Sequence, residues 1–196
     1  MSSAEIPLFP LATVLFPEGS LPLRIFETRY TDMVRRCMRD DTPFGVVLIF
    51  EGREVGTVGS VAAVGTTARI VDFARLEDGL LGIRCRGEQR FRLLASRRQS
   101  DGLHIGTIEL LEAAPAAAVP EDCRHLVEIL DNAWAKLGAQ YEGVAFRRDD
   151  AGWVCARLAE WLPLPKPFKQ RLLESDDAVA SLRLLASLIK PEQADA

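Results

Sequence analysis

The chain has 196 residues, of which 48% are hydrophobic and 27% are charged, and its formal net charge at neutral pH is −4. This length can bury a sizeable core in one large domain or two small ones, and the composition is that of an ordinary globular protein. The negative net charge gives no general reason to expect binding to nucleic acid or to an anionic membrane surface.

The N-terminal stretch from Ile6 to Ile25 is apolar, but it does not have the pattern of a signal peptide. Prolines interrupt it and no Lys or Arg precedes it. Nor does any run of 18 apolar residues predict a membrane span, so we expect a cytoplasmic protein. Short apolar runs at residues 6–9, 13–16 and 21–25 predict strands. Because prolines lack an N–H, we expect them to stop these runs from extending as regular ladder strands.

From residue 26 onward the spacing of apolar residues changes to that of a helix. Six of them fall on one helical face: Phe26, Tyr30, Met33, Val34, Cys37 and Met38. We therefore predict a helix over residues 26–39, ended by residues 40–43. Glu27 lies at its start, where a negative charge suits the helix dipole, and we expect Arg24 to pair with it.

The segment that follows has the pattern of further strands joined by tight turns. The nearly continuous apolar stretch 44–50 is typical of a strand covered on both faces, and 61–73 is a second strand. The Asp-Gly pairs at 78–79 and 101–102 each lie between strand-like runs and predict hairpins. Gly87 separates two such runs and predicts a kink or a bulge. Short strands with one inserted helix predict a small, twisted, partly closed barrel.

Beyond an Ala- and Pro-rich linker candidate at residues 113–120, every segment has helical spacing. Four helices are predicted, at residues 120–137, 151–162, 166–174 and 177–189. We expect Gly138 to cap the first of them and Ser175 to cap the last. The predicted class is therefore α+β: a β-rich lobe over residues 1–115, followed by an all-helical lobe over residues 116–196.

Four cysteines and two histidines are the candidates for metal binding or nucleophilic chemistry. The cysteines are Cys37, Cys85, Cys123 and Cys155. They lie far apart on the apolar phases of their elements, which is typical of buried, reduced thiols. His104 and His125 have no Cys, His or carboxylate at a metal-ligand spacing, and His125 is poorly placed to activate the thiol two residues before it. We expect no metal, no cofactor and no catalytic residue.

Several short motifs occur in an order and spacing typical of one known module. The motifs are Pro7-Leu-Phe-Pro-Leu11, Leu21-Pro-Leu-Arg-Ile-Phe-Glu27, Arg29-Tyr30, Phe44-Gly-Val-Val47, Val64-Gly-Thr66, Trp161-Leu-Pro-Leu-Pro165 and Lys169-Gln-Arg-Leu-Leu-Glu174. Together they resemble the substrate-binding N-terminal domain of Lon proteases along nearly the whole chain. The resemblance implies a PUA-like β pseudo-barrel lobe with one inserted helix, followed by a helical bundle, and it implies binding of unfolded polypeptide.

The ATPase and peptidase segments of a Lon protease are not recognisable in this chain. The ATPase needs a Gly-x4-Gly-Lys-Ser/Thr loop, because its backbone amides and its Lys hold the phosphates, and the dipeptide Gly-Lys does not occur. No segment resembles the one that carries the Ser–Lys peptidase dyad. We therefore expect a free-standing, non-enzymatic module, bacterial by its Arg- and Ala-rich composition. Its expected partners are unfolded polypeptide and, in an adaptor role, a separate protease.

Two groups of residues are candidates for polypeptide binding. The first is the polar face of the predicted helix: Thr28, Arg29, Asp32 and Arg36. A solvated helix face is the competing interpretation. The second group consists of apolar residues expected to stay exposed near the N-terminus: Leu15, Phe16 and Leu21. A groove between the two lobes is a further candidate location.

An arginine stripe supports an alternative function, RNA binding. Its members are Arg84, Arg86, Arg90 and Arg92, which on alternating strands share faces in pairs. PUA-like folds also occur in RNA-binding proteins, so the stripe motivates this hypothesis. Against it, residues 1–115 are nearly neutral and no aromatic side chain shares the arginine face, as base stacking would require. The competing interpretation is that the arginine stems cover apolar surface and pair with acids on neighbouring strands. An enzyme acting between the lobes is a third alternative.

Overall fold

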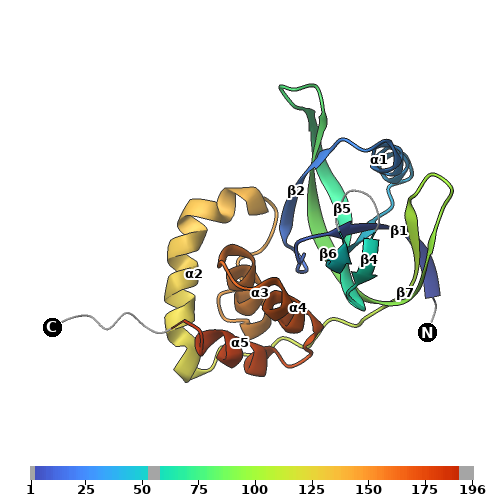
Figure 1. Ribbon diagram of the computed structural model, residues 1–196. Coiled ribbons are helices and arrows are strands. Elements are labelled where there is room, and N and C mark those ends of the chain that lie inside the picture. The colour runs from blue at the N-terminus through green and yellow to red at the C-terminus, as the bar shows by residue number, and fades with distance from the viewer. Residues whose placement is uncertain (1–2, 53–57, 190–196) are drawn as a thin grey trace. The chain divides into compact units, whose positions relative to one another are not determined.

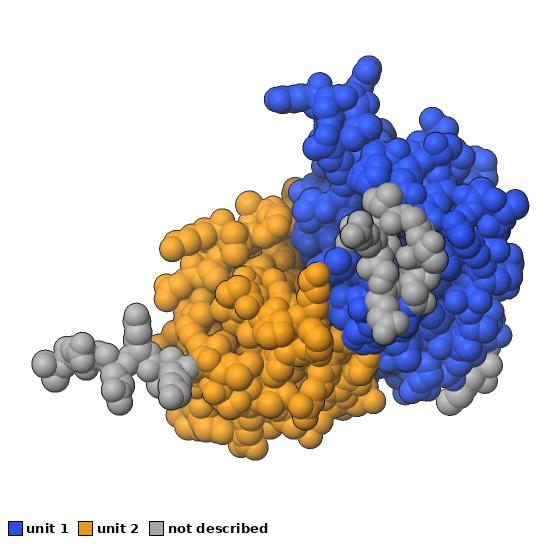
Figure 2. All heavy atoms as spheres, in the orientation of Figure 1, with its two compact units in different colours: residues 1–113 blue, residues 114–196 orange. Residues whose placement is uncertain are grey.

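The computed structural model describes residues 3–52 and 58–189, and the chain divides into two compact units (Figure 2). Unit 1 comprises residues 1–113 and unit 2 comprises residues 114–196. The described part of unit 1 contains strands and one α-helix, whereas every regular element described in unit 2 is helical. The predicted α+β class is thereby confirmed. None of the described helices is long and apolar enough to cross a membrane.

Five strands of unit 1 form a closed ring (Figure 1). In ring order they are β1 (Ser3–Leu11), β7 (His104–Leu110), β6 (Leu81–Arg98), β5 (Val64–Arg75) and β3 (Phe44–Gly52). Neighbours in this order are antiparallel, and the ring closes because β1 also pairs in parallel with β3. Two strands lie outside the ring: β2 (Ser20–Ile25) pairs with β6, and β4 (Val58–Val61) pairs with β3.

β1 is a continuous strand although it contains Pro7 and Pro10, so the prediction that prolines interrupt this run is wrong. The strand changes partner at Leu8: residues 3–8 pair with β7, and residues 8–11 pair with β3. Each half thus has one partner among the described strands. Pro7 and Pro10 have no backbone N–H to donate. The strand tolerates them because each half of β1 needs ladder bonds on one side only.

The irregular segment 12–19, where the sequence predicts a strand at 13–16, lies against Gly87 of β6. The Gly87 N–H donates to the Gly19 carbonyl at 2.9 Å. A Cβ on Gly87 would lie 2.2 Å from the Phe16 carbonyl oxygen, so only glycine permits this approach. Before this glycine β6 pairs with β2, and beyond it β6 pairs with β7 after a register shift against β5. The kink or bulge predicted here is confirmed.

Both predicted Asp-Gly hairpins are present. Gly79 joins β5 to β6 and Gly102 joins β6 to β7, with φ of 83° and 86°. These angles lie in the left-handed region, which glycine enters at no steric cost. The β5–β6 hairpin projects beyond the rest of unit 1 (Figure 1).

The one helix described in unit 1, α1, spans Thr28–Asp40 and packs against the core of the ring. Its buried apolar residues are Tyr30, Met33, Val34 and Cys37. The helix begins two residues later than predicted, with Glu27 as N-cap, and Phe26 is 59% exposed. The expected pair between Arg24 and Glu27 is wrong, because Arg24 pairs with Asp78 in the turn of the β5–β6 hairpin.

The described part of unit 2 consists of four α-helices and two short 3-10 helices. They are η1 (Glu121–Cys123), α2 (Arg124–Leu137), η2 (Gly138–Tyr141), α3 (Ala151–Trp161), α4 (Lys166–Glu174) and α5 (Ala178–Ala186). The four predicted helices are present, but one of the two predicted caps differs. Asp177 rather than Ser175 caps α5, by accepting from the Ala180 N–H at 2.9 Å. Gly138 is the C-cap of α2, as predicted, and it has a right-handed φ because the chain continues into η2.

Aromatic rings surround a buried arginine in unit 2. The Trp134 ring lies 5.3 Å from that of Trp153 and 5.4 Å from that of Tyr141, measured between centroids. Arg157 is fully buried, with its guanidinium 5.2 Å from the Tyr141 centroid and Nε 3.2 Å from Glu160 Oε2. The carboxylate and the ring faces compensate for the loss of water around this charge.

All four cysteines are free and buried, as predicted. Burial raises the pKa of Cys85 and of Cys155 to about 12, so both thiols are protonated at neutral pH. Among the residues that the structure describes, no three His, Cys, Asp or Glu side chains are arranged to hold a metal ion.

Candidate functional site

An open cavity of about 180 Å³ lies in unit 1 between the C-terminal end of α1 and β5. We call it the α1–β5 cleft. Two segments line it: Cys37, Met38, Asp41 and Thr42 at the end of α1, and Arg69, Ile70, Val71, Asp72 and Phe73 of β5. Successive side chains of a strand point to opposite faces. Because five consecutive residues of β5 line the cleft, the strand borders it with its edge.

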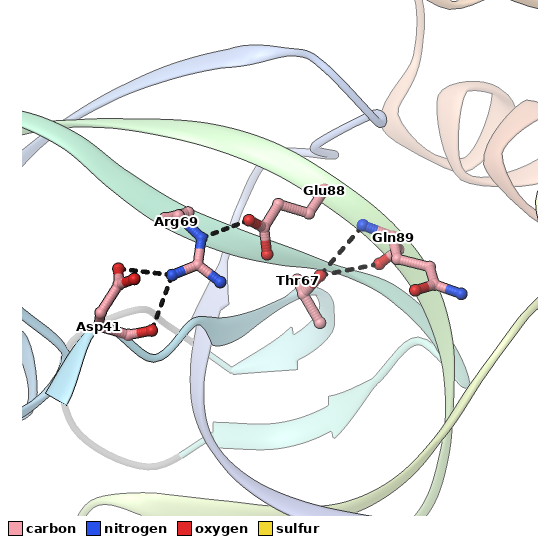
Figure 3. A network of polar contacts seen from close by, with 5 residues as sticks. All are labelled: Asp41, Thr67, Arg69, Glu88 and Gln89. Atoms are coloured by element: carbon pink, nitrogen blue, oxygen red, sulfur yellow. Dashed lines mark hydrogen bonds and ion pairs between the residues drawn. The ribbon is translucent and has the colours of Figure 1, made fainter.

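Arg69 joins the two walls of the cleft (Figure 3). Its Nη1 donates to Asp41 Oδ1 at 2.7 Å and to the Asp41 carbonyl at 2.8 Å, and its Nε pairs with Glu88 of β6. Asp41 is the C-cap of α1 and has a left-handed φ of 48°. The guanidinium therefore also faces the negative end of the helix dipole, where a cation is favourable. These contacts fasten the end of α1 to β5.

A threonine hydroxyl stabilises the strand pair beside Arg69. The ladder between β5 and β6 shifts register at Thr67, which leaves one extra residue on β6. Thr67 Oγ1 accepts from the Gln89 N–H at 3.1 Å and donates to the Gln89 carbonyl at 3.2 Å (Figure 3). These bonds replace the ladder bonds that the bulge removes. The neighbouring Glu88 is thereby held where it pairs with Arg69.

Three large apolar side chains of the cleft are exposed to solvent. Met38, Val71 and Phe73 are 38%, 44% and 60% exposed. Ile70 is half-buried and packs against the core of unit 1. The free energy released on covering apolar surface is roughly proportional to the area covered. A ligand that covers these side chains is therefore stabilised without any change to the core.

β5 has two halves with different surroundings. In the ring half, residues 64–68, the strand pairs with β6 on one side and, at residues 66–68, with β3 on the other. In the open half, residues 69–75, the pairing with β6 continues but no described strand pairs with the other side. Residues 71–75 are all exposed. The open half is thus an edge strand, and its free side has no ladder partner among the described strands.

The thiol that lines the cleft is not suited to nucleophilic chemistry. Cys37 is buried, and burial raises its pKa above the ordinary value, although the hydrogen bond with Thr42 acts in the opposite direction. A protonated thiol is a weak nucleophile. None of the described residues that line the cleft is a histidine that could act as its base. The arrangement therefore favours binding over covalent catalysis.

The predicted polypeptide-binding face of α1 is only partly available to a ligand. Three of its residues are exposed, Thr28, Asp32 and Arg36, and their binding role stays a prediction. Arg29 is 8% exposed, so the expectation that it faces solvent is wrong. Its Nη1 donates to the Gly102 carbonyl at 2.9 Å, and its Nη2 lies 2.8 Å from Glu27 Oε2. Arg29 precedes the buried Met33 by one helical turn, so its stem follows the buried face and ties α1 to the β6–β7 turn.

Two of the three apolar residues predicted to stay exposed near the N-terminus are buried. Leu15 and Phe16 are each 3% exposed, so that prediction is wrong for both. Leu21 is half-buried and packs against the same core. Thr66 Oγ1 donates to the Leu15 carbonyl at 2.6 Å, which satisfies a backbone group of the irregular segment away from water. Segment 12–19 is therefore not a strand, but its Leu15 and Phe16 side chains are buried.

The arginine stripe is not a free cationic surface. Arg90 is 8% exposed and Arg86 is half-buried. Arg84 and Arg92 pair with carboxylates of β5 and β7, each at 3.2 Å. These contacts agree with the competing interpretation, in which the arginines pair with acids on neighbouring strands. RNA binding by the four residues stays a prediction.

Sequence patterns do not single out the exposed residues of the cleft. Val71 and Phe73 fall in the run 61–73, and their apolar character is equally typical of a buried strand face. The one available signal is a difference in length, since this run is longer than the run 44–50. Part of a longer strand beside a shorter one has no partner on that side. This signal needs the knowledge that the two strands are neighbours, which periodicity does not supply.

Comparisons with known proteins agree with one another. The sequence model of the ATP-dependent protease La (LON) substrate-binding domain matches residues 5–191. The crystal structure of a Lon N-terminal domain protein from Xanthomonas campestris is 36% identical and has a TM-score of 0.79, covering 95% of this chain and 99% of that one. The N-terminal domain of the Mycobacterium avium complex Lon protease is 17% identical, with a TM-score of 0.64 over 94% of this chain and 97% of that one, and so shows the fold.

The curated relatives are longer proteins. The Lon protease of Paraburkholderia phytofirmans is 28% identical over an alignment of 198 positions, which covers 92% of this chain and 24% of that protein. Protein cereblon of Gallus gallus is 32% identical over an alignment of 114 positions, which covers 56% of this chain and 24% of that protein. The matches therefore span a quarter or less of the length of these relatives.

Proposed function

The chain belongs to the ATP-dependent protease La (LON) substrate-binding domain family, and from this premise we propose that it binds unfolded or exposed polypeptide in the α1–β5 cleft. In this role it acts as a free-standing, non-catalytic recognition module in the cytoplasm. It hands the bound polypeptide, its client, to a separate protease.

The observation that carries this proposal is the exposed apolar surface of the cleft. Met38, Val71 and Phe73 lie beside a polar network that fixes the positions of both walls. An unfolded polypeptide exposes apolar side chains that a folded protein buries, so it can cover these residues. Covering Phe73 contributes on the order of 1 kcal/mol, since the ring is already partly buried. Affinities are therefore expected to be modest, which suits a client that must be released.

One further observation supports a free-standing module, and another supports a reducing compartment. The Xanthomonas campestris structure, a Lon N-terminal domain protein, is covered to 99% by the match. A chain of similar extent therefore exists as an independently folded molecule. The four free cysteines agree with a reducing compartment.

The proposal is tested by fluorescence anisotropy with a labelled unfolded polypeptide, such as reduced and carboxymethylated α-lactalbumin. Phe73→Ser removes the most exposed apolar residue of the cleft. The matched control, Leu94→Ser, changes a 54% exposed apolar residue of β6 that does not line the cleft. We expect Phe73→Ser to weaken binding about fivefold and the control to change it less than about twofold. Equal affinities for the two variants would contradict the assignment of the cleft.

Structured RNA serves as a competitor at two salt concentrations in the same assay. Polypeptide binding that survives the higher salt and ignores RNA supports the proposal. Displacement by RNA that fades as salt rises would instead favour the arginine stripe, because phosphate contacts release counterions.

The adaptor role has its own readout. A labelled client is incubated with a purified Lon-type protease and ATP, with and without this protein. We expect faster loss of the client when both proteins are present. Cleavage by this protein alone would show an enzymatic activity and overturn the non-catalytic role.

A further inference from the structure

We propose that the client binds as an added β-strand along the open half of β5, with an apolar side chain in the α1–β5 cleft. The inference rests on the proposed function and specifies its mode of recognition. The occupant is an extended polypeptide segment with alternating apolar residues and basic flanking residues.

The ring half of β5 shows what the open half lacks. At residues 66–68 the free side of β5 is occupied by β3, whose ladder begins at Phe44. Before Phe44 the chain belongs to the end of α1 and its connection. Among the described strands, the position beside residues 69–75 is therefore left without an occupant. Since β6 holds the other side of β5, the open half is a preformed template for main-chain hydrogen bonds.

One backbone amide of the open half is satisfied by a side chain instead of a strand. The Phe73 N–H donates to Asp72 Oδ1 at 2.9 Å. A carboxylate next to its own backbone can thus substitute for the carbonyl of a partner strand. Asp72 Oδ2 meanwhile accepts from Arg84 on β6 at 3.2 Å. A client carbonyl can replace the carboxylate at the Phe73 amide while Asp72 keeps its arginine partner.

A bulge lets the edge and the cleft act together. The ladder with β6 passes over Val71, which is an extra residue on β5. Bulges redirect neighbouring side chains, and residues 70–73 all line the cleft. Side chains of an added strand alternate between two faces. Every second residue of the client can therefore contact the exposed side chains of Met38 and Phe73.

The charges around the cleft favour a basic client over an acidic one. Of the charged side chains that line the cleft, two are carboxylates, those of Asp41 and Asp72, and one is a guanidinium group, that of Arg69. Arg69 is shared between Asp41 and Glu88. The carboxylate of Asp41 is 91% exposed, so a cationic side chain of the client can approach it.

The test uses a fluorescein-labelled peptide, Lys-Thr-Val-Thr-Phe-Thr-Val-Thr-Lys, and two N-methylated versions of it. One version carries N-methyl groups on its Val and Phe residues, and the other carries them on its Thr residues. Each set blocks hydrogen bonding along one edge of the extended peptide. We expect one version to bind about tenfold more weakly than the parent and the other to stay within about threefold, because a strand added to an edge uses one set of amides. Exchange of Glu for Lys at both ends is expected to weaken binding about threefold at low salt.

The outcomes separate the binding mode from the proposed function. Equal affinities for the two N-methylated versions, with binding retained or lost in both, would overturn strand addition. If both versions still bind, the proposed binding in the α1–β5 cleft is retained without strand addition. If the parent peptide and the unfolded polypeptide also fail to bind, the proposed function is wrong. Amide exchange locates the contact: bound peptide is expected to slow exchange at Phe73. Unchanged exchange there would overturn the assignment to β5, and equal binding of the Glu peptide would overturn the charge preference.

Discussion

The two halves of β5 share one strand and one partner, yet their surroundings differ. Residues 64–68 are buried in the ring, where β6 and β3 approach from both sides. Residues 71–75 are exposed, with β6 on one side and no described strand on the other. Both halves contain residues typical of strands. Whether such a stretch becomes core or recognition surface is therefore decided by the neighbouring strand.

The largest effect is expected from an atom added on β6 opposite the ring half of β5, because the irregular segment 12–19 packs closely against β6 there. Gly87 pairs with Ala68, and a Cβ on Gly87 would lie 2.2 Å from the Phe16 carbonyl oxygen. Because the contact is with backbone, Gly87→Ala is expected to lower the free energy of unfolding by about 3 kcal/mol. Urea denaturation followed by circular dichroism measures it. A midpoint equal to that of the parent protein would contradict the close approach.

The buried arginine of α1 gives the next largest effect. Arg29→Met keeps the apolar stem but removes the bond to the Gly102 carbonyl and the pair with Glu27. We expect the free energy of unfolding to fall by about 2–3 kcal/mol. The lower end of this range is expected because the Glu27 side chain is 22% exposed and regains contact with water. Polypeptide binding per folded molecule should stay unchanged. Lost binding with unchanged stability would instead restore the role in polypeptide binding predicted from the sequence.

Gly79, at the turn that ends the open half, is the matched partner of Gly87. Its φ is 83°, and a Cβ there would meet only the flexible Arg75 guanidinium, at 3.6 Å and beyond. Gly79→Ala is therefore expected to cost about 1 kcal/mol, from the left-handed backbone alone. The same denaturation experiment applies. A cost as large as that of Gly87→Ala would show that the hairpin and the ring are equally constrained.

The smallest expected effect is the absence of a reaction at Cys85, on the buried side of β6. Burial raises its pKa to about 12 from an ordinary 9.0, so almost no thiolate exists at pH 8. Iodoacetamide should leave Cys85 unmodified in the folded protein and modify it in urea, as read by mass spectrometry. The raised pKa also means that its contribution to stability is complete below pH 9 and is lost as the pH rises toward 12. Rapid alkylation of the folded protein would show that the ring opens.

Local signals determined many of the elements. The Asp-Gly turns, the apolar stripe of α1 and the bounds of α4 were predictable, because each depends on residues within a few positions of one another. The burial of the four thiols followed from their apolar phase. The resemblance to the Lon substrate-binding domain depended on motifs along the chain and is confirmed by the family match.

Tertiary structure alone decided the features that concern function. An apolar run has the same pattern whether it becomes an edge or a core, so Leu15 and Phe16 could not be distinguished from Val71 and Phe73. Arg29 turned inward because a carbonyl from a distant turn was within reach of its guanidinium. Most helices and strands followed from the sequence because those preferences are local, although the strand predicted at residues 13–16 is an irregular segment. Which strand lacks a neighbour depends on contacts between residues far apart in the chain, and only the folded ring decides it.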